Sequence, residues 1–272
     1  MDTQMQTRNS AVDLNARITK RIQELAQATD AARVSEEMQR YLDMCSRFHQ
    51  YSPCNVWLIL MSQPNASYIA GFKKWQSMGR YVRKGEHGIP IFAPIISTVT
   101  NNLGEEDQRL VGFKVVYVFD VSQTDGEPLT EPPDWKSTEK NIELMNKLTR
   151  FAHDKGIRIQ VKHIGHDIQG VSTGGKIIVD PNAGSKTIIH EIAHELLHHV
   201  EGTLTNSTIR ELEAESVAYV VAKHFGLDGL ASPNYIALHG ATAELILEHL
   251  ERIRNTAAEI IITLEKESEP VY

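Results

Sequence analysis

The sequence lacks several features that would each indicate a particular class of protein. Among 272 residues it contains two cysteines, Cys45 and Cys54, too few for a disulfide framework or a zinc site made of thiolates. The segment Met1–Ser10 is polar and has no apolar core of the kind found in secretory signals. The nearby apolar run Val56–Met61 is far shorter than the roughly 20 residues that span a bilayer. We therefore expect a cytoplasmic protein with reduced, structural cysteines and no membrane segment.

No residue type is in strong excess either. The chain has 41% hydrophobic and 23% charged residues, with 17 Gly and 10 Pro, which excludes the disordered, collagen-like and low-complexity classes. No repeat of solenoid period is visible. The length suits two modest domains or one large one, and either would bury a substantial core.

The net charge of -7 taken alone argues against a nucleic-acid partner, but the charges are unevenly distributed along the chain. Residues 1–136 carry 15 basic and 16 acidic side chains and the rest carry 13 and 19, so the two parts sum to -1 and -6. Between Cys45 and Glu86 the sequence contains arginines and lysines, but no acidic residue before Glu86. A local basic surface on an acidic protein is therefore compatible with the composition.

The segment Gln123–Glu139 marks the clearest boundary, because three prolines, a glycine and several acidic residues interrupt all periodicity there. We predict a first domain over residues 1–125, a linker over 126–139 and a second domain over 140–272. Both domains mix helices and strands, so the predicted fold class is α+β.

Apolar residues recur at helical spacing in the first domain, and β-branched residues follow later. We expect helices at Leu14–Gln27, Val34–His49 and Asn55–Gln63, and strands at Pro90–Ser97 and Leu110–Val121, with the polar loop Asn101–Arg109 between the strands.

The sequence pattern of the second domain predicts a small sheet followed by helices, which is the layout of a compact zincin domain. A Gly-Gly turn within Gly170–Asp180 indicates a hairpin. We expect a strand at Ile157–His163 and helices at Asn141–Ala152, Lys186–Glu201, Ile209–Phe225 and Ala241–Lys266.

The predicted helix Lys186–Glu201 contains the motif His-Glu-x-x-His as HEIAH. Residues four apart share one helix face about one turn apart, so His190 and His194 can direct their imidazoles at one Zn²⁺. Glu191 lies one residue on and cannot be a third ligand from the same face. It can instead act as a base toward a zinc-bound water, whose pKa falls to about 7.

A catalytic zinc needs three protein ligands and an open position, so a third ligand is expected from a nearby helix. The predicted helix Ile209–Phe225 offers Glu211 and Glu215 on one face, whereas Glu213 is rotated about 200° from Glu211 at 3.6 residues per turn. We predict Glu211 as the ligand and Glu215 as the acceptor for the outer N–H of a ligating histidine. The reverse assignment of these two glutamates is the alternative.

Two simpler interpretations stand beside a catalytic zinc. The residues could be ordinary charges on two helices, or the zinc could only stabilise the second domain. His198 and His199 follow at the helix end, where cations suit the helix dipole. We predict them to be capping or surface residues, since further ligands would close the open site.

The stretch Tyr68–Gly85 interleaves aromatic and cationic residues with glycines. Single-stranded nucleic acid binds in this way, because bases stack on aromatic faces while Lys and Arg neutralise phosphates. Gly79 and Gly85 permit tight turns that bring the backbone close to a ligand. The alternative is that Phe72, Trp75 and Tyr81 belong to the core and the charges form a solvated rim. The predicted DNA-binding residues are Phe72, Lys73, Lys74, Trp75, Arg80, Arg83 and Lys84.

Several segments resemble the ArdC antirestriction family. They are YSPCNVWLILMSQPNASYIAGFKKWQSMGRYVRKGEHGIPIFAPI, VVYVFDVSQTDGEPL, HEIAHELLHH and RELEAESVAYVV, within Tyr51–Lys223. The resemblance implies an N-terminal domain that binds single-stranded DNA. It also implies a C-terminal metallopeptidase-like domain related to the ImmA/IrrE peptidases.

Carried over by position, the resemblance implies roles for individual residues. DNA contact falls on the region of Phe72, Lys73, Trp75, Gly79, Arg80, Arg83, Lys84 and Gly85. Metal binding and catalysis fall on His190, Glu191, His194 and the glutamates within Glu211–Glu215. The short polar loop Asn101–Arg109 departs from the family pattern, so any DNA contacts that family members place there are not expected here. Nothing is carried over beyond Asp228.

Two functions follow as hypotheses. The first is an antirestriction protein that coats incoming single-stranded DNA and has a gluzincin-like zinc metallopeptidase domain. The alternative is an intracellular endopeptidase that cuts a specific regulatory protein and uses its N-terminal domain for targeting. The partners are therefore single-stranded DNA and, for the peptidase, a protein substrate. The sequence does not indicate the oligomeric state, the restriction system opposed or the metal used in the cell.

Overall fold

The computed structural model describes residues 11–28, 31–100, 106–129, 138–164, 168–199, 206–227 and 240–266, together with residues 230, 233 and 238. The chain divides into two compact units. Unit 1 comprises Met1–Ile22 and Cys54–Thr130, and unit 2 comprises Gln23–Pro53 and Glu131–Tyr272. Segment 23–53, which the sequence pattern placed in the first domain, is thus grouped with unit 2. The predicted bounds 1–125, 126–139 and 140–272 stay a prediction.

Two helices contribute apolar faces to unit 1. The first, α1 (Ala11–Gln27), buries Leu14, Ile18 and Ile22, which recur every four residues and so lie on one face. The other helix, α3 (Pro53–Ser62), begins at a proline, which is well tolerated at the first helical position. Its apolar run is buried on all sides, as expected for a core helix. Both helices confirm the elements predicted from periodicity.

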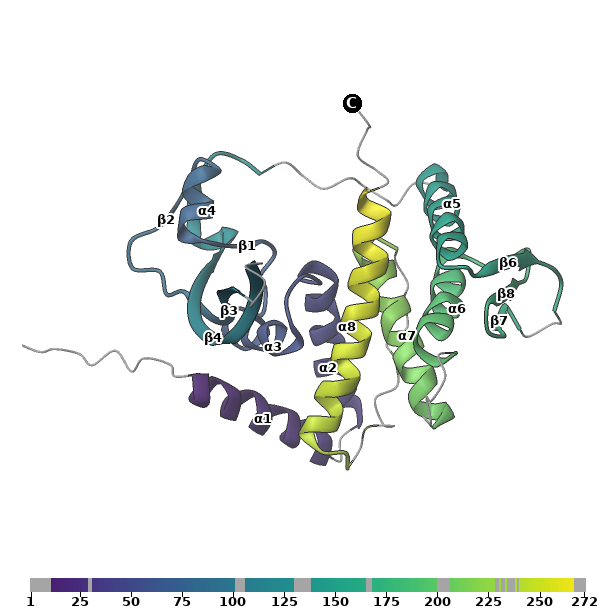
Figure 1. Ribbon diagram of the computed structural model, residues 1–272, viewed down its shortest axis with the longest axis horizontal. Helices are drawn as coiled ribbons and strands as arrows, with labels where there is room; N and C mark the ends of the chain where they lie inside the picture. Colours follow the sequence, from purple (N-terminus) through teal and green to yellow (C-terminus); the bar gives the residue numbers. More distant parts are fainter. Residues whose placement is uncertain are drawn as a thin grey trace, which may run out of the picture. The chain divides into compact units, whose positions relative to one another are not determined.

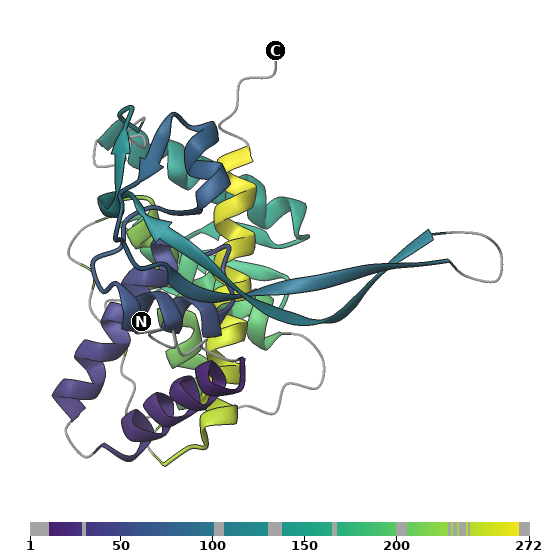
Figure 2. The ribbon, with the colours of Figure 1, turned by 90° about the vertical axis from the view of Figure 1, so that its left-hand side faces the viewer.

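The main sheet of unit 1 has the strand order β1-β4-β3 and is antiparallel throughout. Its strands are β1 (Ile69–Gly71), β3 (Ile89–Thr100) and β4 (Glu106–Asp120). A register shift between Ile95 and Ile96 marks a bulge in the β3–β4 pair, and this pair forms the long twisted ribbon seen in Figure 2. The predicted loop Asn101–Arg109 was wrong in its last part, because strand β4 already begins at Glu106. Residues 101–105 lie outside the described part of the chain.

A small ribbon packs beside this sheet and was not predicted from the sequence. Strand β2 (Arg80–Val82) follows the short helix α4 (Phe72–Ser77) and pairs with β5 (Thr124–Gly126). A Cβ on Gly126 would lie 2.3 Å from the carbonyl oxygen of Gly79, so only glycine fits there. The first residues of the predicted boundary segment Gln123–Glu139 are therefore part of a 3₁₀ turn and a strand of unit 1.

Asp120 ties the end of β4 to the chain before β1. Its carboxylate accepts hydrogen bonds from the backbone N–H groups of Ser67, Tyr68 and Ser122 at 2.8, 3.2 and 2.9 Å. Burial alone would raise the pKa of Asp120, but these hydrogen bonds outweigh it and the pKa is lowered. The 3₁₀ helix η1 (Val121–Gln123) starts from this cap.

Unit 2 contains the helices α2 (Ala31–Arg47) and α5 (Thr138–Asp154) and a sheet of order β6-β8-β7. Strand β6 (Arg158–Val161) is parallel to β8 (Lys176–Val179), and β7 (Gly170–Ser172) is antiparallel to β8. Gly174 and Gly175 join β7 to β8 with φ values of 79° and 77°, as a Gly-Gly hairpin requires. The predicted strand and hairpin are confirmed.

Three further helices complete unit 2, namely α6 (Ser185–His198), α7 (Ser207–His224) and α8 (Ala243–Lys266). They pack against one another and run side by side in Figure 1. Glu195 of α6 holds the β7–β8 turn, since its carboxylate accepts the N–H groups of Thr173, Gly174 and Gly175 at 3.0, 2.9 and 2.6 Å. The hairpin is thereby fixed against α6. The described helices include none that is both long and apolar enough to cross a membrane.

Candidate metal centre

Helix α6 brings together the two histidines of the sequence motif. The Nε2 atoms of His190 and His194 are 3.0 Å apart, as the four-residue spacing predicted. Ile188, Ile189 and Ile192 are buried elsewhere on the helix and anchor it in the core of unit 2. The imidazole pair is therefore held on a rigid element rather than on a loop.

Glu211 of α7 completes a cluster with these histidines. Its Oε1 lies 3.3 Å from Nε2 of His194, and its Oε2 lies 3.5 Å from Nε2 of His190. Ligands about 2.0–2.1 Å from a tetrahedral zinc are separated by about 3.3 Å, so the spacing suits such an ion. Among the described residues, these three form a group whose side chains could hold a metal.

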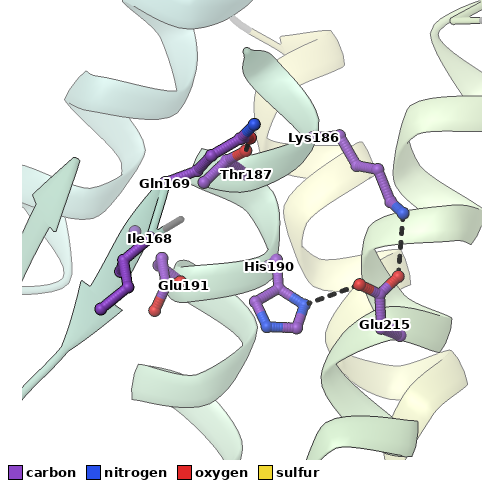
Figure 3. A pocket seen from close by; sticks show the side chains of 8 residues that line it. Ile168, Gln169, Lys186, Thr187, His190, Glu191 and Glu215 are labelled. Atoms are coloured by element: carbon purple, nitrogen blue, oxygen red, sulfur yellow. Dashed lines mark hydrogen bonds and ion pairs between the residues drawn. The ribbon is translucent and has the colours of Figure 1, made fainter. Parts of the chain in front are cut away.

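Glu215 lies one helical turn after Glu211 and contacts the outer side of His190. Its Oε1 is 3.6 Å from Nδ1 of His190, and its Oε2 is 2.9 Å from Nζ of Lys186 (Figure 3). This geometry agrees with the outer position proposed for Glu215 and favours Glu211 as the ligand. The assignment stays a prediction until a metal is bound.

The protonation of the histidines also suits a cation. Burial, followed by the neighbouring His190 and His198, lowers the pKa of His194 to about 3, so this ring is neutral. Burial likewise lowers the pKa of His190. Nδ1 of His190 is the nitrogen nearer Glu215, at 3.6 Å, and a neutral ring with its proton on Nδ1 would carry a lone pair on Nε2 toward His194 and Glu211. Converging lone pairs and a carboxylate call for a cation, and imidazole with carboxylate suits several divalent metals.

Glu191 is buried next to the histidine pair, where it faces a cavity of about 420 Å³ (Figure 3). A Cβ on Gly170 would lie 2.7 Å from Oε1 of Glu191, so the glycine lets the β7 backbone approach the carboxylate closely. Burial, and then the charges of Glu211 and Glu195, raise the pKa of Glu191 to about 7. A carboxylate with this pKa is suited to proton transfer near neutrality. The other residues that line the cavity are Ile168, Gln169, Lys186, Thr187, His190 and Glu215.

The prediction for His198 was wrong. His198 is buried, and its Nδ1 lies 3.0 Å from Nδ1 of His194 while its Nε2 lies 2.8 Å from Oε2 of Glu213. The signal was present in the sequence, since His190, His194 and His198 recur every four residues. His199 is exposed as predicted, with Nε2 at 3.1 Å from Oγ of Ser172.

Glu213 points away from Glu211, as predicted, but it is fully buried at 0% exposure. Its Oε1 lies 2.8 Å from Nδ1 of His249 and 3.3 Å from Nε of Arg252, both on α8. Burial alone would raise the pKa of Glu213, but the hydrogen bonds from His198 and His249 and the charge of Arg252 lower it to about 2. Sequence reasoning missed His249 and Arg252, because nothing in their local pattern connects them with the motif.

The predicted DNA-binding stretch separates into buried and exposed residues. Trp75 is 0% exposed and its Nε1–H donates to the carbonyl oxygen of Phe119 at 3.0 Å. Its ring is therefore part of the core, which corrects its assignment as a surface for base stacking. Phe72 is 49% exposed and Tyr81 is 61% exposed. The lysines of the stretch, Lys73, Lys74 and Lys84, are also exposed.

Arg80 and Arg83 are engaged within unit 1. The Arg80 guanidinium donates to the hydroxyl and carbonyl oxygens of Thr124 at 2.9 and 3.1 Å and to the carbonyl oxygen of Glu127. Arg83 pairs with Glu86 at 2.7 Å and with Asp125 at 3.4 Å. Arg80 therefore joins β2 to β5, and part of the charge of Arg83 is balanced by acids.

Comparison with known proteins identifies the family of this chain from its N-terminal part. Residues 12–147 match the family described as the N-terminal domain of anti-restriction factor ArdC. The uncharacterized protein pXO2-81 of Bacillus anthracis is 28% identical, and the match covers 85% of this chain and 48% of that protein. The chain thus spans about half the length of this curated relative.

Solved structures are similar in fold. The metal-free crystal structure of the antirestriction ArdC protein from the R388 plasmid is 17% identical with a TM-score of 0.50, over 80% of this chain and 85% of that chain. The Mn(II)-bound structure of that protein has a TM-score of 0.48, with 85% of this chain and 99% of that chain covered. The similarity to the metal-free structure shows that the mixed helix and sheet architecture described above is ArdC-like.

Proposed function

Because this chain belongs to the family of the N-terminal domain of anti-restriction factor ArdC, we propose that it is an antirestriction protein that binds DNA. The match over residues 12–147 is the single observation that carries this proposal. We further propose that unit 2 holds a divalent metal, with zinc as the first candidate, and uses it for hydrolysis. The convergence of His190, His194 and Glu211 supports the metal centre.

Single-stranded DNA is the proposed ligand of unit 1. The exposed rings of Phe72 and Tyr81 suit stacking with unpaired bases, and the exposed lysines Lys73, Lys74 and Lys84 suit phosphate contact. Because Trp75 and Arg80 hold the fold, a test of DNA binding has to leave them in place.

A matched pair of double variants tests this ligand. Phe72→Ala with Lys73→Ala should weaken binding of a fluorescent single-stranded oligonucleotide by about 10-fold or more, at about 1–3 kcal/mol per stacked base. The control, Val161→Ala with Lys162→Ala, removes an exposed apolar residue and an exposed lysine from unit 2. Fluorescence anisotropy at several salt concentrations is the measurement. Equal affinity of the two double variants, or equal binding of duplex and single strand, would reject the proposal.

Hydrolysis of a peptide bond is the proposed chemistry of unit 2. A bound zinc ion would act as a Lewis acid and lower the pKa of water at the site. Glu191 is placed to accept a proton at its carboxylate, from its position beside His190 at the cavity. The β7 backbone at Gly170 lies directly against this carboxylate and restricts its orientation.

Replacing Glu191 by Gln separates catalysis from metal binding. The variant should retain zinc, measured by elemental analysis after dialysis, but lose cleavage of denatured casein or of a regulatory partner protein. Cleavage that survives in Glu191→Gln would exclude the base role. If zinc-loaded wild type cleaves none of these substrates, the metal is structural, and a thermal melt with chelator should then show a large loss of stability.

The second candidate function is an intracellular endopeptidase in which unit 1 recruits the substrate. It is supported by the position of Glu191 at the cavity, a carboxylate that a purely structural zinc site does not need. Cleavage of a specific protein by full-length chain in the absence of DNA would favour this candidate over the first.

A further inference from the structure

A fully buried carboxylate lies behind the candidate metal centre. Glu213 is 0% exposed. Its carboxylate oxygens lie 2.8 Å from Nε2 of His198, 2.8 Å from Nδ1 of His249 and 3.3 Å from Nε of Arg252. Removing a charge from water costs several kcal/mol unless it is paired and hydrogen-bonded, so such a group is rare unless it has a role. We call Glu213, His198, His249 and Arg252 the Glu213 network.

The network determines where the protons of His194 and His198 lie. An ionised carboxylate only accepts hydrogen bonds, so Nε2 of His198 carries a proton and donates it to Oε2 of Glu213. Arg252 also approaches Glu213, with its Nε 3.3 Å from Oε1. An imidazole that carries one proton and donates it from Nε2 has a lone pair on Nδ1, and Nδ1 of His198 faces Nδ1 of His194 at 3.0 Å. His194 must donate from Nδ1, and its Nε2 is left as a lone pair.

That lone pair points into the candidate metal centre. Nε2 of His194 lies 3.0 Å from Nε2 of His190 and 3.3 Å from Oε1 of Glu211. Helix α7 thus acts on both nitrogens of His194: Glu211 lies beside Nε2, and Glu213 reaches Nδ1 through His198. The two glutamates on different faces of α7 serve the same imidazole.

Helix α8 closes the arrangement. Its His249 and Arg252 bind Glu213, and Nη2 of Arg252 also donates to the carbonyl oxygen of Leu197 at 3.1 Å, near the end of α6. The network therefore spans three helices and locks the end of α6 against α7 and α8. By contrast, the outer nitrogen of His190, Nδ1, lies 3.6 Å from Oε1 of Glu215, whose side chain is 38% exposed.

We propose that the Glu213 network is a positioning device that keeps His194 in the tautomer and orientation required for metal binding, with His198 as the direct positioning residue. This role rests on the proposed metal centre. Partners of this kind, which hydrogen-bond the outer nitrogen of a metal-ligating histidine, typically change metal affinity 10–100-fold when they are replaced.

Zinc affinity of the full-length chain provides the first test, measured by competition with a chromophoric chelator. His198→Phe should lower the affinity about 10–100-fold and Glu213→Gln about 10-fold. His49→Phe is the matched control, because His49 is a buried histidine of unit 2 that lies outside the Glu213 network. The control should bind zinc as wild type does. If His198→Phe does not fold, Glu213→Gln still tests the network.

The tautomer of His194 provides the second test, one that a merely structural role would not affect. Nitrogen NMR of the imidazoles in the metal-free chain should show His194 protonated at Nδ1 in wild type and His49→Phe. In Glu213→Gln and His198→Phe the signal should shift toward a mixture of tautomers. If the zinc affinity and the His194 tautomer are both unchanged in the two network variants, the inference is overturned and the metal centre stands. Wild type that fails to bind zinc would instead overturn the metal centre, and the NMR measurement still decides whether the network sets the tautomer.

Discussion

Residues 68–85 of unit 1 and the helices α6 and α7 of unit 2 are both rich in residue types that commonly bind ligands, but the fold arranges them differently. In the helices, His190, His194 and Glu211 converge on one point, with contacts of 3.0–3.5 Å between their ligating atoms. In the stretch, Trp75 is buried, Arg80 joins two strands, and Phe72 faces solvent. Helices α6 and α7 thus bring their candidate residues together at one point. In residues 68–85 the candidate residues are split between the core and the surface.

The difference follows from what each pattern specifies. Spacing of four along a helix states which side chains share a face, because the helix has 3.6 residues per turn. Composition alone does not state where a side chain points, and the stretch contains a short helix, two turns and two three-residue strands. A periodic motif on a helix therefore predicts which side chains come together better than a run of suitable residue types does.

Replacing Trp75 by Ala tests the division of the stretch with the largest expected effect. Loss of this fully buried ring should destabilise unit 1 by about 3–5 kcal/mol, as large-to-small core substitutions do. Phe72→Ala, at a half-exposed ring, should cost about 1 kcal/mol or less. Urea unfolding followed by circular dichroism measures both. Equal destabilisation by the two variants would contradict the division of the stretch.

The convergence of the helices is tested by comparing two glutamates on one face of α7. Glu211→Gln should weaken zinc binding by about 100-fold or more, since it removes a ligand, whereas Glu215→Gln should weaken it by about 10-fold through His190. Chelator competition measures both constants. A larger loss in Glu215→Gln would reverse the assignment of ligand and outer partner.

Asp120 holds the start of the stretch in place, because its carboxylate accepts hydrogen bonds from the N–H groups of Ser67 and Tyr68. Asp120→Asn should destabilise unit 1 by about 1–2 kcal/mol at pH 7. The pKa of Asp120 is lowered from its ordinary value of 3.8, so the stabilisation is fully present above that pH and is lost as the pH falls further. Unfolding of both proteins between pH 7 and pH 3 should therefore show their difference shrinking at the acid end. A difference that is constant with pH would show that the charge is not the cause.

Two cations of the stretch give the smallest expected effects. Arg80→Lys should cost about 1 kcal/mol, since lysine cannot reproduce the forked contacts with Thr124 and Glu127. Lys84→Ala, at an exposed position, should change stability by less than about 0.5 kcal/mol. Thermal melts measure both variants. If Lys84→Ala is as destabilising as Arg80→Lys, then the exposed cations also hold the fold.

Most of the helices and the longer strands were predictable, because each has a periodic apolar face or a run of β-branched residues. The short elements β1, α4, β2 and β5 were not, since three to six residues carry too little pattern. Strand β4 begins inside a segment that reads as a polar loop, at Glu106, because pairing with β3 stabilises strand structure there despite the local composition. Of the candidate site, the spacing predicted His190, His194, Glu191 and the pair of glutamates.

By itself, the sequence determined the motif on α6, the face of α7 that carries Glu211 and Glu215, and the resemblance to the ArdC family, which the family match bears out for the N-terminal part. The tertiary structure alone decided that His198 is buried against His194, that Glu213 meets His249 and Arg252, and that Trp75 lies in the core. The physical reason is that helical periodicity acts within about two turns of chain. Burial and the pairing of charges depend on which distant segment packs against each face.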